Sequence, residues 1–181
     1  MSSVIIKNVR FSYVYVFEPS KMSGKYSVRV LVPKDNTEAL NALKEAIEDC
    51  KRNPKSLDTW KNGGKVPGNL TVFLRDGDVE FPDDPVYKNN YFFNSSNTSA
   101  PTVLDIRGKE ITSPNEFYSG CFGAFNGSVF AYNSNGNRGI SVSLDNLLKQ
   151  SDGEKLTGGQ SAKTAFAGLF EEDDSPFKDM M

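Results

Sequence analysis

Eight basic and aromatic side chains in this 181-residue chain are of the types that bind unpaired nucleic acid. They are Lys25, Arg29, Trp60, Lys61, Lys65, Tyr118, Tyr132 and Arg138. Cations follow a phosphate backbone, and aromatic faces stack on unpaired bases at about 1–3 kcal/mol per base. The set predicts a binding surface for single-stranded DNA, and such a surface needs no catalytic group.

Trp60 is the strongest aromatic candidate, because Lys61, Gly63 and Gly64 follow it in a predicted loop that offers little to pack against. Phe122 and Phe130 lie in a predicted strand, where phenylalanine usually belongs to the core, so we expect both to be buried. A surface lysine is commonly just solvated, so each of these residues carries little weight alone.

An acidic run, RDGDVEFPDD at residues 75–84, is the second constellation that bears on chemistry. Its carboxylates belong to Asp76, Asp78, Glu80, Asp83 and Asp84. One interpretation is a magnesium-dependent nuclease, because such oxygens are the ligands that magnesium prefers. Asp76 and Asp78 flank a glycine, however, and carboxylates in that setting cap their own backbone amides in a turn. We therefore expect a turn, no bound metal and no cofactor.

The chain contains no histidine, which removes imidazole metal ligands and the usual acid–base side chain near neutral pH. We expect no enzymatic activity. Cys50 and Cys121 lie far apart without a CxxC pattern, which is typical of buried thiols in a reducing compartment. No apolar run approaches the length of a membrane span, so we expect no membrane partner.

The charge is unevenly distributed along the chain. Residues 170–181 contain five carboxylates and one lysine, a net charge of −4, whereas residues 1–169 carry 20 basic and 18 acidic groups, a net charge of +2. This asymmetry predicts an acidic tail that acts near a mildly basic surface.

The clearest elements are a hairpin and a helix. Residues 4–17 and 25–32 predict two antiparallel strands; the odd positions from Val9 to Phe17 share one face, and Lys25 and Arg29 point outward from the second strand. Residues 35–52 predict a helix capped by Asp35 or Asn36, and residues 53–69 predict a loop.

The rest of the chain predicts short strands, at residues 70–78, 91–96, 101–106, 116–133 and 140–144. The first of them runs into a turn at its Asp-Gly pair, Asp76 and Gly77. Glycines at 120, 123 and 127 indicate bulges or close backbone approach. Because bulges and strand glycines help a sheet to close, we expect a mainly β, OB-fold-like antiparallel barrel, closed or partly open, with one inserted helix. A β-sandwich is the alternative.

The order of these segments resembles one phage family. FSYVYVFEP, KYSVRVLVPK, LRDGD, YFFN and YSGCFGAFNGSVFAYNSNGNRGISVSLDNLLKQSDGEKLTGG are similar to the phage single-stranded DNA-binding proteins, first catalogued as a family of unknown function. The resemblance covers about residues 8–160. It implies an OB-fold that sequesters single-stranded DNA during phage replication, recombination and repair, without catalysis, in the cytoplasm of the infected bacterial host.

The resemblance also implies a flexible acidic C-terminus, and we divide the chain into a DNA-binding domain, 1–160, and a linker with tail, 161–181. The tail residues expected to compete with DNA or to recruit replication or recombination proteins are Glu171, Glu172, Asp173, Asp174 and Phe177. DDSPF resembles the tip of bacterial single-stranded DNA-binding proteins, in which the phenylalanine is terminal, whereas here KDMM follows Phe177.

A function of another class stays open at this point. The net charge of +2 on residues 1–169 is small for a DNA-binding domain, and this favours a phage structural or assembly protein that binds no nucleic acid. The sequence leaves open whether the chain forms a homo-oligomer.

Overall fold

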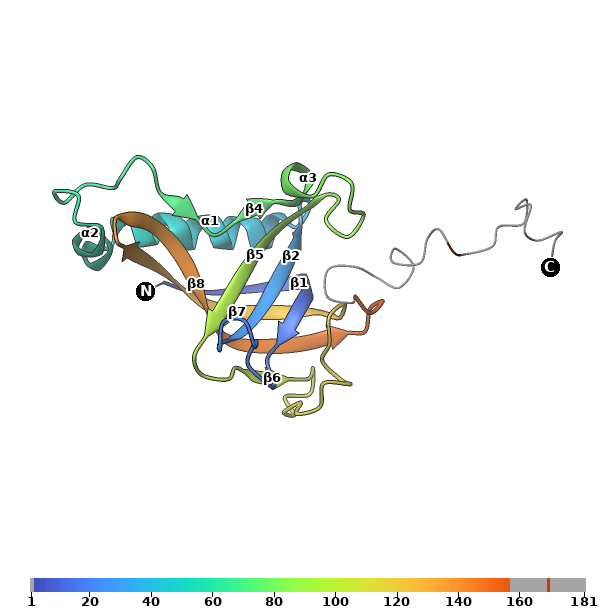
Figure 1. Cartoon of the computed structure of the whole chain (residues 1–181). Coiled ribbons are helices and arrows are strands. Elements are labelled where there is room, and N and C mark those ends of the chain that lie inside the picture. The colour runs from blue at the N-terminus through green and yellow to red at the C-terminus, as the bar shows by residue number, and fades with distance from the viewer. Residues whose placement is uncertain (1, 157–168, 170–181) are drawn as a thin grey trace, which may run out of the picture.

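The computed structural model describes residues 2–156 and residue 169. Eight strands and three helices follow one another along this part of the chain (Figure 1). In order they are β1 (Ser2–Tyr15), β2 (Tyr26–Pro33), α1 (Thr37–Arg52), α2 (Pro54–Trp60), β3 (Thr71–Val72), β4 (Arg75–Asp76), α3 (Gly77–Glu80), β5 (Asn90–Asn97), β6 (Thr102–Leu104), β7 (Phe122–Ser134) and β8 (Asn137–Ser151).

Five of the strands pair into a closed ring in the order β1, β2, β5, β8, β7 and back to β1. The short strands β3 and β6 extend along β8, and β4 extends along β5. A mainly β fold with a helix between the second and third strands of the ring is therefore confirmed. The ring is mixed rather than wholly antiparallel, because β8 pairs in parallel with β3, β5 and β6.

The ring closes at a very short junction between β5 and β8, where Ser96 opposite Ser143 is the single residue pair. Two side chains of β5 extend this junction. The Ser95 hydroxyl donates to the carbonyl oxygen of Val142 at 3.0 Å, and the Asn97 amide donates to that of Leu144 at 3.0 Å. Side-chain hydrogen bonds thus replace backbone pairs at this point of the ring.

Strand β1 changes its inward face twice, which the sequence analysis did not foresee. The bulges lie between Ile6 and Val9 and between Ser12 and Tyr15. Asn8 and Tyr13 have positive φ angles there, 59° and 48°. The prediction that the odd positions from Val9 to Phe17 share one face therefore holds only from Val9 to Phe11 and is wrong at Tyr15. Each bulge inserts one residue, so the inward-facing positions change from odd to even or back.

Glycines mark the bulges of β7, as expected. The register with β8 shifts at Gly123 and again at Gly127. A Cβ atom at Gly127 would lie 2.3 Å from the carbonyl oxygen of Ser143, so the backbones approach too closely for any other residue. Strand β7 begins later than the strand predicted at 116–133, because residues 116–120 form turns before it.

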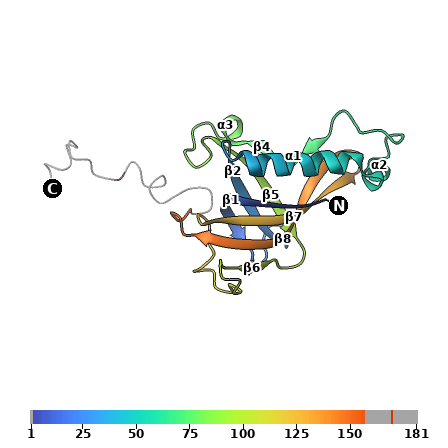
Figure 2. The ribbon, with the colours of Figure 1, turned by 180° about the vertical axis from the view of Figure 1, so that it is seen from behind.

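Helix α1 packs against β1 and β7, as both views of the ribbon show (Figures 1 and 2). Asn36 caps it by accepting from the amide of Ala39, and the same side chain donates to the carbonyl oxygens of Lys7 and Asn8. The helix start is thereby tied to the first bulge of β1. The predicted helix at 35–52 is confirmed to within two residues.

The predicted loop at residues 53–69 begins instead with α2. Asn53 caps this helix and Pro54 occupies its first turn, a sequence signal for a helix start that we had assigned to a loop. α2 places Trp60 in the core with 0% of its surface exposed, and the indole nitrogen donates to the carbonyl oxygen of Gly139 at 3.1 Å. The prediction of Trp60 as an exposed stacking aromatic is therefore wrong.

The predicted strand at residues 70–78 is also broken, into β3, β4 and α3. Asp76 caps α3 by accepting from the amide of Asp78, so the predicted turn, in which a carboxylate caps a backbone amide, is confirmed and takes the form of a short helix. Among the described residues, no helix is long and apolar enough to span a bilayer. The predicted tail at 161–181 lies outside the described residues, Leu169 apart.

The ring junction predicts a stability effect at Ser95, which is only 2% exposed. Ser95→Ala leaves the carbonyl oxygen of Val142 without its donor in a buried place, so we expect the free energy of unfolding to fall by about 1–3 kcal/mol. Ser27→Ala is the matched control, because the Ser27 side chain makes no hydrogen bond within the described chain and should change stability by less than about 0.5 kcal/mol. Urea unfolding of the three proteins measures this difference, and equal midpoints would contradict the role given to the junction.

Candidate nucleic-acid interface

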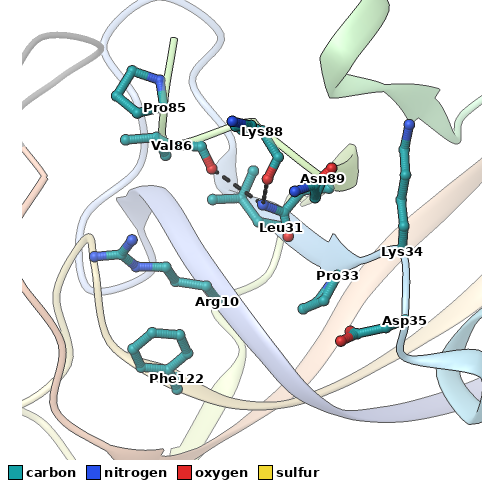
Figure 3. A pocket seen from close by; sticks show the side chains of 11 residues that line it. Arg10, Leu31, Pro33, Lys34, Asp35, Pro85, Val86, Lys88, Asn89 and Phe122 are labelled. Carbon is teal, nitrogen blue, oxygen red and sulfur yellow. Dashed lines mark hydrogen bonds between the residues drawn. The ribbon is translucent and has the colours of Figure 1, made fainter.

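An open groove with a volume of about 740 Å³ lies on the outer face of the ring (Figure 3). Its floor comes from β1, β2, the turn after β2, and the first residue of β7, and one wall comes from the segment between α3 and β5. The lining residues that carry charge are Arg10, Lys34, Asp35 and Lys88; Leu31, Val86 and Phe122 supply apolar surface. The groove is thus net basic with an apolar floor.

A row of directly paired residues crosses this face of the sheet. Arg10 of β1 pairs with Phe122 of β7 on one side and with Leu31 of β2 on the other. Leu31 pairs in turn with Phe92 of β5, and Phe92 pairs with Arg75 of β4. Directly opposite residues of neighbouring strands point to the same face, so five strands contribute to one row. Phe122 and Arg75 are exposed at its ends, whereas Leu31 and Phe92 are buried against Tyr87.

Arg10 and Phe122 form one end of the row. The Arg10 guanidinium lies 5.2 Å from the ring centroid of Phe122 and donates to the carbonyl oxygens of Gly120 (3.0 Å) and Glu154 (2.8 Å). The Phe122 side chain is 37% exposed. The prediction that Phe122 is buried is therefore wrong. Phe122 is the first residue of β7 after a turn and points outward, whereas Phe125 and Val129 of the same strand point into the core. Phe130 is half-buried rather than fully buried.

Arg29 lies in the next row, between Ser12 and Asn94. Its guanidinium donates to the Asn94 side chain at 2.8 Å and to the Tyr87 hydroxyl at 2.7 Å, and it is 4.8 Å from the ring centroid of Tyr13. Burial raises the pKa of Tyr87 even though the guanidinium opposes this shift. Arg29 thus lies beside the predicted surface, but its guanidinium already has partners within the chain.

The acidic run at 75–84 is largely occupied by contacts within the chain. Lys34 donates to Asp76 and Asp78 at 2.8 Å each. These hydrogen bonds lower the pKa of both carboxyls and raise the pKa of Lys34. Asp84 accepts from the amide of Val86, as a turn residue does. Within the described chain no cluster of histidine, cysteine, aspartate or glutamate could hold a metal ion, so the nuclease alternative has no structural support there.

A second basic cluster lies at the end of the molecule that carries α2, away from α3 (Figure 1). Arg138, at the start of β8, donates to the carbonyl oxygen of Lys61 at 3.3 Å, which brings these two predicted residues together. Lys65 follows in the same exposed loop. Tyr132 packs across Gly139, close to the buried Trp60. The Nε of Arg138 is buried and makes no hydrogen bond to any described residue.

The other two predicted residues lie apart. Lys25 is exposed in the connection between β1 and β2. The Tyr118 hydroxyl donates to Asp152 at 2.8 Å, and the ammonium groups of Lys149 and Lys155 lie 5.4 and 5.5 Å from its ring centroid. Burial and Asp152 raise the pKa of Tyr118. The eight predicted residues are thus divided over four places rather than gathered in one.

Sequence reasoning missed the residues that line the groove most prominently: Arg10, Lys34, Lys88 and Phe122. Two signals were available. Arg10 stands between Val9 and Phe11, so an inward face for those two already places Arg10 outward. Phe122 immediately precedes a bulge glycine, where a strand changes its face. Lys88 lies in an irregular segment, and nothing in its sequence context places it beside β1.

Comparisons with known proteins show the family of the chain. The family model described as "Enterobacter phage Enc34, ssDNA-binding protein" matches residues 2–177. A putative protein p50 of Acyrthosiphon pisum secondary endosymbiont phage 1 is 32% identical over 163 residues, which cover 85% of this chain and 86% of the relative.

Solved structures give the same result. The single-stranded DNA-binding protein of bacteriophage Enc34 in complex with single-stranded DNA superposes with a TM-score of 0.73 at 29% identity, covering 86% of this chain and 90% of the other. A single-stranded DNA-binding protein of bacteriophage T7 superposes with a TM-score of 0.58 over 96% of this chain and 98% of the other, and at 15% identity this likeness concerns the fold alone.

The contact of Lys34 with two carboxylates predicts a pH-dependent stability. A carboxyl whose pKa is lowered by folding stabilises the fold above its ordinary value, 3.8, and this contribution is lost as the pH falls through the lowered value. Lys34→Met should therefore lower the urea midpoint at pH 7, and the difference from the unsubstituted protein should shrink in strong acid. The raised pKa of Lys34 means that its own contribution persists up to its ordinary value, 10.5.

Lys44→Met is the control for this experiment, since Lys44 is exposed on α1 and makes no ion pair within the described residues. Its midpoint should follow that of the unsubstituted protein at every pH. A Lys34→Met deficit of the same size at pH 7 and pH 2 would show that the ion pairs do not cause it.

Proposed function

Because the chain belongs to the family of phage single-stranded DNA-binding proteins that includes the protein of Enterobacter phage Enc34, we propose that it binds single-stranded DNA without catalysis. The observation that carries the proposal is the basic groove together with Arg10 and Phe122, the exposed pair at one end of the paired row. Leu31 and Phe92, in the middle of the row, are buried against Tyr87 and support this surface from below. In OB-folds, oligonucleotides bind on the face of the second and third strands, which here are β2 and β5.

The row and the groove supply the two contacts that an unpaired strand requires. Phe122 and Phe81 are large aromatic side chains with exposed surface on this side of the ring, and they can stack on bases. Lys88 is exposed in the groove and makes no ion pair within the described residues, so its ammonium is available to a phosphate. Stacking accepts any base, and the binding should therefore tolerate any sequence.

We propose a longer path for the strand beyond the groove. OB-folds also bind oligonucleotides through the loop between their first two strands and the loop between their last two. In this chain Lys25 lies in the first of these loops, and Arg138 with Lys61 and Lys65 lies beside the second. The exposed cations there would follow the phosphates outside the groove. We assign supporting roles to Tyr118, whose hydroxyl donates to Asp152, and to Tyr132, which packs across Gly139.

The acidic tail is proposed to compete with DNA for the groove. The last described residue of the body, Leu156, donates its amide to the carbonyl oxygen of Ser119, and Arg10 binds the carbonyl oxygen of Glu154. The body therefore ends beside the groove. Phe170 stands fourteen positions after Leu156, and a chain of that length spans at most about 50 Å, so Glu171 to Asp174 can reach Arg10 and Lys88.

The same tail is proposed to recruit replication or recombination proteins through Phe177 when DNA occupies the groove. The chemistry is an acidic peptide with one aromatic side chain, presented to a basic, apolar pocket of the partner. The cellular setting that suits these activities is the cytoplasm of the infected bacterium, with roles in phage replication, recombination and repair.

The alternative class, a phage structural or assembly protein that binds no nucleic acid, is distinguished by one experiment. Binding of fluorescently labelled oligo-dT is followed by anisotropy at several salt concentrations. We expect a complex whose log affinity falls with log salt by about 0.7 for each phosphate neutralised. Phe122→Ala should weaken the complex by about 1–3 kcal/mol without changing this slope, because stacking releases no counterions.

Lys88→Met is the matched variant, because it removes a charge and no aromatic ring; it should lower the slope by about 0.7. Lys44→Met, on the far helix, should change neither quantity. The absence of any salt-sensitive complex with oligo-dT would reject DNA binding and leave the structural role.

Removal of residues 170–181 should tighten oligo-dT binding at low salt, by roughly severalfold, because a tethered peptide acts at about millimolar effective concentration. The gain should disappear above about 0.5 M salt, where charges are screened. Phe177→Ala in the full chain is the control: it keeps all five carboxylates and should leave DNA affinity unchanged. A truncated protein that binds no more tightly than the full chain would show that the tail does not compete.

A further inference from the structure

One wall of the groove, residues 81–90, has no regular secondary structure apart from the first residue of β5. Consecutive turns form it: the amides of Asp84, Tyr87 and Asn90 donate to the carbonyl oxygens of Phe81, Asp84 and Tyr87. The Asn90 side chain adds bonds to the carbonyl oxygens of Val86 and Lys88 (Figure 3). These bonds lie within the wall and shape it. The end of the wall is attached separately, because the Lys34 amide donates to the carbonyl oxygen of Asn89 at 2.9 Å and the Asn89 amide donates to the Asp78 carboxylate at 3.0 Å.

Arg29 attaches the middle of this wall to the sheet. From β2 its guanidinium donates to Asn94 of β5 and to the hydroxyl of Tyr87 in the wall, at 2.8 and 2.7 Å. Tyr87 is only 5% exposed and packs on Leu31 and Phe92. A single side chain therefore spans two strands and the wall.

Aromatic rings surround the same guanidinium. Its central carbon lies 4.8 Å from the ring centroid of Tyr13, 4.9 Å from that of Phe92, and 5.8 Å from those of Phe81 and Tyr87. Tyr13 belongs to the second bulge of β1, and Phe81 begins the wall. A planar cation with donors in fixed directions can stack and hydrogen-bond in this way, whereas an ammonium group cannot do both.

We propose that Arg29 is a positioning residue for the DNA-binding groove: it holds the wall that carries Val86 and Lys88 against the sheet, and it does not neutralise a phosphate. The inference rests on the proposed function and assigns a different role from the phosphate contact that the sequence suggested. A phosphate that captured this guanidinium would have to replace the bonds to Asn94 and Tyr87 and release the wall.

The proposal predicts that charge alone does not substitute for Arg29. Arg29→Lys keeps the charge but not the two-point contact, and Arg29→Met keeps only the length of the side chain. Both variants should bind oligo-dT about tenfold more weakly or worse, since hydrogen bonds to a charged group are lost. Because the released wall carries Lys88, the dependence of log affinity on log salt should change equally in both variants, by no more than the 0.7 or so that Lys88→Met causes. A phosphate contact at Arg29 would instead be kept in Arg29→Lys.

Hydrogen exchange of the free proteins supplies an independent measurement. Amides within residues 81–90 should exchange faster in Arg29→Lys and Arg29→Met, while amides of α1 and β7 stay protected. Tyr87→Phe is the milder variant, because it removes only the hydroxyl that accepts from Arg29 and keeps the packed ring. It should show the same local change to a smaller degree, so the proposal stays testable if Arg29→Met does not fold.

Two outcomes would overturn the proposal. A slope that falls by about 0.7 in Arg29→Met, with affinity restored in Arg29→Lys, would identify Arg29 as a phosphate contact. Unchanged exchange of residues 81–90 in every variant would show that Arg29 does not hold the wall. If even the unsubstituted protein binds no oligo-dT, the proposed function fails, whereas faster exchange confined to the wall would still support the attachment by Arg29.

Discussion

The architecture depends on how a sheet of only five principal strands closes on itself. β5 and β8 meet at one residue pair, and the Ser95 and Asn97 side chains complete the junction by donating to backbone carbonyls of β8. A ring this small requires sharp bending, which the bulges of β1 and the glycines of β7 provide. These irregularities decide which side chains point outward, so the closure of the ring also determines the composition of the outer surface.

Phenylalanine and branched aliphatic side chains pack in the interior of the ring. On the outside, Leu31, Tyr87 and Phe92 form a separate small apolar cluster. The cations around this cluster divide into two kinds. Arg29 and Lys34 form hydrogen bonds and ion pairs with other residues of the chain, whereas Lys88 is exposed and has no ion-pair partner within the described chain. The net charge counts cations that are paired within the chain together with cations that are free to contact a phosphate. A small net charge on the body is therefore compatible with DNA binding.

The sequence predicted those parts of the fold whose cause is local. Helix α1 follows from its cap and apolar stripe, and the inward face of β2 follows from strict alternation. The parity of β1 could not be predicted, because its first bulge lies in the pairing with the distant strand β7 and its second interrupts the hairpin with β2 inside an unbroken β-branched and aromatic run. Trp60 was misplaced for a similar reason: the cap at Asn53 was visible, but the partner that buries the indole, Gly139, lies 79 residues away. The groove depends on residues 81–90 packing against β2, across from Arg10 of β1, and no local pattern encodes that proximity.

The burial of Trp60 also has a practical side. It is the only tryptophan of the chain, it lies in the core between α2 and the start of β8, and it is remote from α3 and the groove. Its emission is therefore a spectroscopic probe of whether the ring is intact. An oligonucleotide short enough to occupy only the groove has no direct route to quench it, whereas a longer strand that reaches Lys61 and Arg138 passes close to the indole. A sample can thus be monitored at two wavelengths, one reporting the integrity of the protein and the other a dye on the oligonucleotide, so that a variant that unfolds is told apart from a variant that has only lost its ligand.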